Sequence, residues 1–114
     1  MDYELLFLKA LAVTVSVETL VLLLLAKPIL KTGLPVSRLI FAGILCSAAT
    51  LPYLWFVFPR FIQDRTVMII IGEASVVLAE TVFYRMILNV DWKKAVLFSV
   101  CCNAASMATG RLIF

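Results

Sequence analysis

The chain has 114 residues, of which 64% are hydrophobic and 15% charged, and its formal net charge is +3. Soluble domains are about 45–50% apolar and about 25% charged, and a small domain buries too little of its surface to hide so much apolar area. The composition therefore excludes an ordinary soluble domain and favours an integral membrane protein whose partner is the lipid bilayer. The few basic residues are scattered between apolar runs, so we expect no nucleic-acid partner.

Four apolar runs are long enough to cross a bilayer, which takes about 20 helical residues. They cover residues 5–26, 36–58, 67–88 and 95–114, and short connections with proline, glycine or asparagine separate them. Short connections favour antiparallel neighbours. The sequence thus predicts one all-α domain over residues 1–114, a bundle of four transmembrane helices that run up-down-up-down.

Basic residues are shared unequally between the two ends of these runs. The first and third connections, with the residues beside them, hold Lys27, Lys31, Arg38, Arg85, Lys93 and Lys94. The other side holds Arg60 and Arg65, with Lys9 and Arg111 near the chain ends. Because basic loops stay in the cytoplasm, we predict that loops 27–38 and 85–94 are cytoplasmic. Both termini are then outside, and we expect the membrane to be a bacterial or archaeal plasma membrane.

The two halves of the chain resemble each other. Glu18-Thr19 is followed by Cys46-Ser47-Ala48-Ala49-Thr50, and Glu80-Thr81 is followed by Cys102-Asn103-Ala104-Ala105-Ser106. This pattern predicts two tandem two-helix hairpins, residues 5–58 and 67–114. An even number of spans in each unit keeps both hairpins in the same orientation, related by an axis along the membrane normal. A chain this small would then oligomerise to enclose a pathway.

Glu18 and Glu80 lie at matched depth, slightly past the middle of their spans. A carboxylate there is costly and should face the bundle, a partner or a water-filled cavity. We predict that both bind a proton, a cation or a small substrate. The alternative is that they only join helices by hydrogen bonds, as polar residues do in many bundles.

Glu73 and Tyr84 lie on the same helical face as Glu80, two turns before it and one turn after it. The three side chains could line one polar stripe that leads outward from the middle of the span. For Glu73 the simpler interpretation is that it lies near the outer interface and reaches water.

Ser47, Thr50 and Asn103 supply neutral hydrogen-bonding groups at the same depth. Asn103 needs several partners in lipid, and a hydrogen bond to Glu80 or Glu18 would supply one. We expect these three residues to orient the glutamates. The face of the last span that carries Asn103 is also rich in small residues, which favours close helix packing.

The remaining residues predict no cofactor. Cys46, Cys101 and Cys102 lie in apolar runs, with no CxxC pair and no histidine in the chain, so we expect free buried thiols. No catalytic motif is present, and the sequence leaves the identity of any bound metal open. We predict a small oligomeric transporter or channel. The rivals are a structural or accessory subunit of a larger membrane complex and, less favoured, a membrane-embedded enzyme acting on lipids.

Overall fold

In the computed structural model, which describes residues 2–113, the chain is 88% helical and that range contains no β-strand. The elements in chain order are α1 (Tyr3–Leu24), η1 (Leu25–Ile29), α2 (Val36–Pro52), η2 (Tyr53–Val57), α3 (Phe58–Phe61), α4 (Arg65–Leu88) and α5 (Trp92–Ile113). They form four helices long and apolar enough to cross a membrane, Tyr3–Ile29, Val36–Phe61, Arg65–Leu88 and Trp92–Leu112. The predicted all-helical fold with four long apolar helices is confirmed, which suggests a membrane protein.

Two of the four helices contain a wide π-helical turn, and each turn is associated with a proline. Pro28 lies inside η1, and Pro52 ends α2 directly before η2. Proline has no N–H to donate to the preceding turn, so an α-helix is disturbed there. The π-helical turns restore bonding over a longer step, from the amide of Leu30 to the carbonyl of Leu25 (2.8 Å) and from Phe58 to Tyr53.

The last two helices begin at aspartate caps. Asp64 accepts a hydrogen bond from the Val67 amide (3.1 Å), and Asp91 accepts one from the Lys94 amide (2.9 Å). Each carboxylate satisfies an amide that would otherwise lack a partner in the first turn and complements the positive end of the helix dipole. Asn89 ends α4 in the left-handed conformation (φ 53°), so a connection of only three residues reverses the chain.

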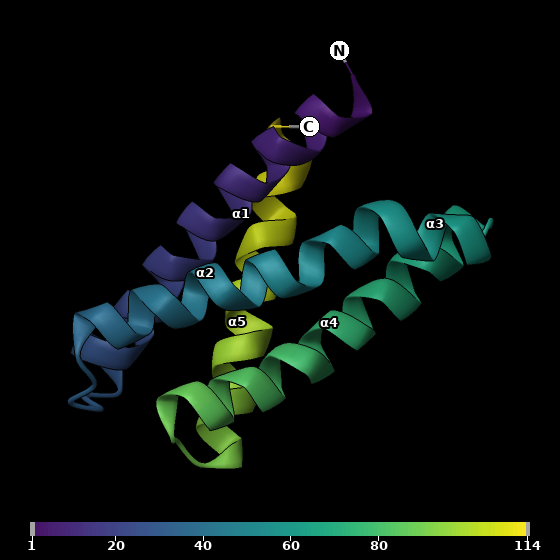
Figure 1. Ribbon diagram of the computed structural model, residues 1–114. Coiled ribbons are helices and arrows are strands. Elements are labelled where there is room, and N and C mark those ends of the chain that lie inside the picture. Colours follow the sequence, from purple (N-terminus) through teal and green to yellow (C-terminus); the bar gives the residue numbers. More distant parts are fainter. Residues whose placement is uncertain (1, 114) are drawn as a thin grey trace.

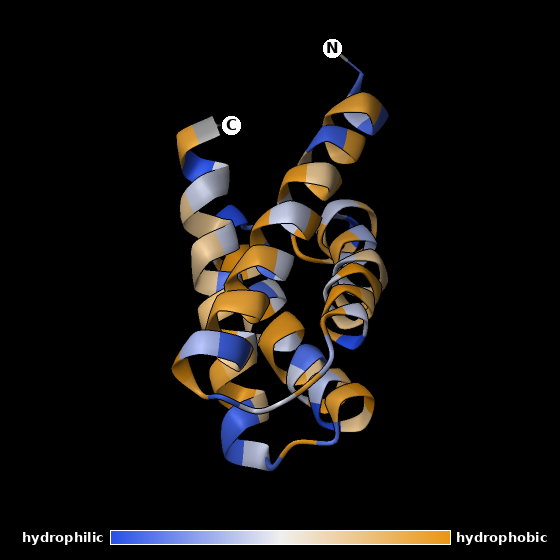
Figure 2. Ribbon diagram, turned by 90° about the vertical axis from the view of Figure 1, so that its left-hand side faces the viewer, coloured by the Kyte–Doolittle hydropathy of each residue, from blue (hydrophilic) through white to orange (hydrophobic). Residues whose placement is uncertain are grey.

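The four long helices pack in a ring. α1 contacts α2 and α5, and α4 also contacts α2 and α5 (Figure 1). Both termini lie at the same end of the molecule in both views (Figures 1 and 2). The buried core lies where the four helices meet, and its largest side chains are Tyr84, Phe98, Leu22, Leu39 and Leu88.

Aromatic side chains hold the first turns of α1 against η2. The Tyr3 hydroxyl donates a hydrogen bond to the Trp55 carbonyl (2.5 Å), and the two rings lie 5.1 Å apart. Phe7 packs edge-on against Phe56 at 4.8 Å. At the opposite end, Arg85 lies over the Trp92 ring at 4.9 Å and donates to the Val90 carbonyl, which fastens the α4–α5 connection.

The outward-facing surface is apolar along the length of the helices. Exposed fractions reach 59% for Leu20, 63% for Ile70, 70% for Leu78 and 74% for Met86. Figure 2 shows hydrophobic residues over most of the helices and hydrophilic ones gathered at the two ends. A continuous apolar belt of this kind is a surface for lipid or for another protein rather than for water.

Candidate functional site

A buried polar layer crosses the interior of the bundle, and all four long helices contribute to it. Its members are each at most 7% exposed: Glu18, Ser47, Thr50, Glu80, Thr81, Ser99 and Asn103. Polar groups in such surroundings cost free energy unless they find hydrogen-bonding partners inside the protein. The contacts within this layer therefore decide what it can do.

Glu18 on α1 is paired with Ser47 on α2. The carboxyl group is 1% exposed, the serine is fully enclosed, and the Ser47 hydroxyl donates a hydrogen bond to Glu18 Oε2. A second interhelical contact reaches the backbone of the same residue, because the Cys102 thiol lies 3.4 Å from the Glu18 carbonyl oxygen. Three helices thus hold Glu18 in place.

Glu80 on α4 is paired with Asn103 on α5 in the same way. Both residues are buried, and Asn103 Nδ2 donates to Glu80 Oε1. The same amide nitrogen donates to the Ser99 carbonyl at 2.8 Å, so both of its hydrogens are used. Of the two partners predicted for Asn103, Glu80 or Glu18, the structure shows Glu80.

The two carboxyl groups lie close enough to interact with each other. Each acts on the other electrostatically, and Glu73 acts on both. The side chains that act on the two carboxyls are neutral or acidic. Glu80 Oε2 is enclosed and has no hydrogen-bonding partner among the described residues. Two carboxylates in this position are costly in an apolar interior when both are charged and uncompensated.

Tyr84 lies beside this pair, one turn after Glu80. It is fully enclosed, its ring meets Phe98 edge-on at 6.2 Å, and the thiols of Cys46 and Cys102 lie near its hydroxyl. The hydroxyl makes no hydrogen bond within residues 2–113. Sequence reasoning treated the two cysteines as inert. Their matched places, each directly before the donor to a glutamate, were the signal that they share this site.

Other predicted site residues lie at the edge of the layer. Glu73 is half-buried, and the structure gives it no hydrogen bond. Thr50 is buried, but its hydroxyl donates to the Cys46 carbonyl (2.7 Å), and it lies near Glu80 rather than Glu18.

The buried positions of the two hairpins correspond at constant spacing. Each buried residue of α1 and η1 lies 62 positions before a buried residue of α4. The four pairs are Ala10 with Gly72, Glu18 with Glu80, Leu22 with Tyr84 and Ala26 with Leu88. In α2 the buried positions include Leu39, Ala42, Gly43, Cys46 and Ser47, each 56 positions before a buried residue of α5: Ala95, Phe98, Ser99, Cys102 and Asn103. The two glutamate–donor pairs therefore occupy equivalent places in the two hairpins.

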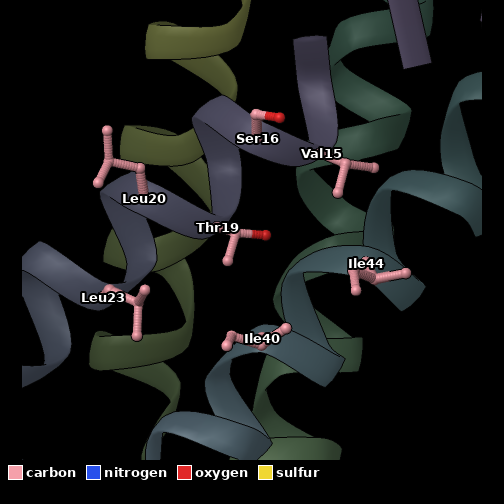
Figure 3. Close-up of a pocket in the computed structure, with 7 residues that line it drawn as sticks. All are labelled: Val15, Ser16, Thr19, Leu20, Leu23, Ile40 and Ile44. Carbon is pink, nitrogen blue, oxygen red and sulfur yellow. The ribbon is translucent and has the colours of Figure 1, made fainter. Parts of the chain in front are cut away.

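Two grooves open on the outside of the bundle. The first, of about 340 Å³, lies between α1 and α2 and is lined by Val15, Ser16, Thr19, Leu20, Leu23, Ile40 and Ile44 (Figure 3). The second, of about 190 Å³, lies between α2 and α4 and is lined by Ala49, Thr50, Tyr53, Phe58, Ser75, Val76, Ala79 and Phe83. Neither is lined by a glutamate, but Thr50 connects the second groove to Glu80.

Within residues 2–113, no three His, Cys, Asp or Glu side chains are placed to hold a metal ion. No family of known proteins, no curated protein and no solved structure matches this chain.

Proposed function

We propose that this chain is an integral membrane protein that binds a proton, a cation or a small substrate at Glu18 and Glu80, and that it works as a small transporter or channel. Its four helices would cross the bilayer up-down-up-down as two tandem hairpins, with loops 27–38 and 85–94 in the cytoplasm. It would act as a homo-oligomer in a bacterial or archaeal plasma membrane.

One observation carries the proposal: two buried carboxyl groups from different hairpins interact with each other, and their donors are neutral. A buried carboxylate is stable when it is paired with a positive charge. The groups around Glu18 and Glu80 are neutral or acidic, so the compensating charge has to come from a bound species. Ionisable groups inside membrane helices are typical of ion and proton pathways.

Flux measurements in liposomes test the proposal. We expect the wild-type chain to conduct protons, sodium or potassium, and Glu18→Gln and Glu80→Gln each to abolish that flux while the helical circular-dichroism spectrum is kept. Glu4→Gln, the same chemical change at an exposed position of α1, is the control and should retain full flux. Full flux in both buried variants would refute the proposal.

A structural or accessory subunit is the second candidate, and a different observation favours it. Each glutamate already has a donor from a neighbouring helix, as expected of polar residues that only hold helices together. This function predicts that a larger protein co-purifies in mild detergent and that Asn103→Leu releases it. The mass of the purified complex separates the two candidates, because a transporter of this size is expected as a defined homo-oligomer.

A further inference from the structure

The groove between α2 and α4 has walls of an unusual kind for a lipid-facing surface. Three aromatic rings line it, those of Tyr53, Phe58 and Phe83, together with two alanines that leave room between the helices. Aromatic faces attract cations, most strongly where water is excluded. At about 190 Å³ the groove is smaller than the roughly 300–1,000 Å³ of drug-sized pockets, so it selects small occupants.

The two hydroxyl groups of this groove are arranged to accept rather than to donate. Thr50 donates its hydrogen to the Cys46 carbonyl at 2.7 Å, and Ser75 donates to the Ile71 carbonyl at 2.8 Å. A hydroxyl has one hydrogen, so both oxygens are left with lone pairs only. The polar atoms of the groove are therefore electron-rich, as a cation requires.

An uncompensated carboxyl oxygen lies behind Thr50. Thr50 is 7% exposed, and its side chain lies close enough to act on the Glu80 carboxyl group. Asn103 binds Glu80 Oε1, and the enclosed Oε2 has no hydrogen-bonding partner among residues 2–113. Thr50 thus lies between the groove, which it lines, and the enclosed carboxyl group of Glu80.

We propose that the α2–α4 groove binds a small lipophilic organic cation of the quaternary ammonium class, which enters from the side of the bundle between the aromatic rings and neutralises Glu80. The proposal rests on the proposed function, since it names the substrate class for the same buried carboxyl. An inorganic ion would not use three aromatic rings, and a neutral acyl chain would use neither the ring faces nor the lone pairs of the two hydroxyl groups.

The α1–α2 groove is a natural control. It is larger, but its lining residues include no aromatic side chain (Figure 3). The carboxyl group nearest to it along the chain is Glu18, whose Oε2 already accepts from Ser47. A groove of this kind offers an organic cation neither ring faces nor an unpartnered oxygen.

Calorimetric titration of the purified full chain in nanodiscs tests the proposal, with benzyltrimethylammonium as the probe and neutral neopentylbenzene as its isostere. We expect saturable binding of the cation and about tenfold weaker binding of the isostere, given the worth of cation–π contacts in a dry site. Glu80→Gln should weaken cation binding by about tenfold as well. Equal binding of the two probes would overturn the proposal and identify a site for acyl chains.

Filling the groove gives a test that leaves Glu80 in place. Ala79→Leu from α4, or Ala49→Leu from α2 should the first fail to fold, is expected to weaken cation binding about tenfold, whereas Ser16→Leu in the α1–α2 groove should not. Unchanged binding in the filled variants overturns the proposal. Liposome flux separates this failure from that of the proposed function. If glutamate-dependent proton flux is present but the cation does not bind, only the groove site is refuted. If neither the flux nor the cation binding is observed, the groove site and the proposed function are both refuted.

Discussion

The two hairpins bury a glutamate at the same place and satisfy it with different chemistry. In α1–α2 the donor is the hydroxyl of Ser47, and in α4–α5 it is the amide of Asn103. A serine offers one hydrogen and is short, so its helix must approach closely. An asparagine offers two hydrogens and reaches further, so it binds Glu80 and the backbone of its own helix at once.

The small residues around each pair follow from this difference. Opposite Thr19 in the first hairpin stands Gly43, and a Cβ there would lie 3.2 Å from the Thr19 Cα. At the equivalent position the second hairpin has Ser99, whose hydroxyl donates to the Val77 carbonyl at 2.7 Å. At this position the first hairpin has a close contact between its helices, and the second hairpin has a hydrogen bond between its helices. A buried carboxyl group thus requires a hydrogen-bond donor, but either a hydroxyl or an amide side chain can supply it.

The largest stability effect should come from removing the asparagine donor. Asn103→Leu keeps the volume but removes the hydrogen bond to Glu80 and the side-chain hydrogen bond to the Ser99 carbonyl, so we expect the free energy of unfolding to fall by about 2–3 kcal/mol. Ser47→Ala removes one bond and should cost about 1 kcal/mol. Thermal unfolding in detergent measures both.

The control for this pair is Ala104→Leu, next to Asn103 on the exposed side of α5, which should leave the unfolding midpoint unchanged. Equal losses in Asn103→Leu and Ser47→Ala would mean that the second bond of the asparagine contributes nothing.

A smaller effect should follow from adding a methyl group at the close contact. Gly43→Ala forces the Cβ against Thr19, and we expect a loss of about 1–3 kcal/mol from overpacking. Thr19→Ala removes the hydroxyl that meets the new atom, so the double variant should lose less than the sum of the single losses. Gly110→Ala is the matched control, because a Cβ there has nothing within 4 Å and should not destabilise the protein. Additive losses at Gly43 and Thr19 would show that α1 and α2 do not depend on this contact.

The smallest effect concerns the connections. Asn89 has φ 53°, so Asn89→Ala should cost about 1 kcal/mol, whereas Asn89→Gly should be tolerated. In the first connection the same conformation is shared by Lys31 (φ 51°) and Gly33 (φ 73°). Lys31→Gly should therefore stabilise the first hairpin slightly. A loss in both glycine variants, measured by thermal unfolding, would contradict this explanation of the turns.

The positions of the helices could be predicted because long apolar runs, and the proline, glycine and asparagine residues that separate them, are local features of the sequence. The second run was expected to begin at residue 36, and α2 begins at Val36. The predicted ends were less accurate. The first helical segment extends past the expected residue 26 to Ile29, because a π-helical turn accommodates Pro28, and the second extends past the expected residue 58 to Phe61. Proline marks a disturbance in a sequence, but whether the helix ends or widens there depends on packing against neighbours.

The candidate site could be predicted in part. The sequence singled out two glutamates because they lie in apolar runs, and the need of Asn103 for partners indicated that it would bind one of them, Glu80 or Glu18. The sequence could not show that Thr50 would bond to its own helix or that Tyr84 would lie beside two thiols, because these contacts depend on how far each helix is rotated. The correspondence of buried positions needed the structure, since the inner and outer faces of these helices are both apolar in the sequence.

The wide turn at η2 divides the second helical segment into two parts that can be adjusted separately. Ser47 and Thr50 precede it, and the ring contacts of Trp55 and Phe56 with the start of α1 lie within it. A π-helical turn holds one residue more than an α-helical turn needs. Relative to an unbroken α-helix of the same sequence, one extra residue in this turn shifts Phe58–Phe61 by about 100° around the helix axis with respect to the polar layer. The extra residue thus works as a spacer that sets the angle between the inner acidic centre and the aromatic end of the bundle.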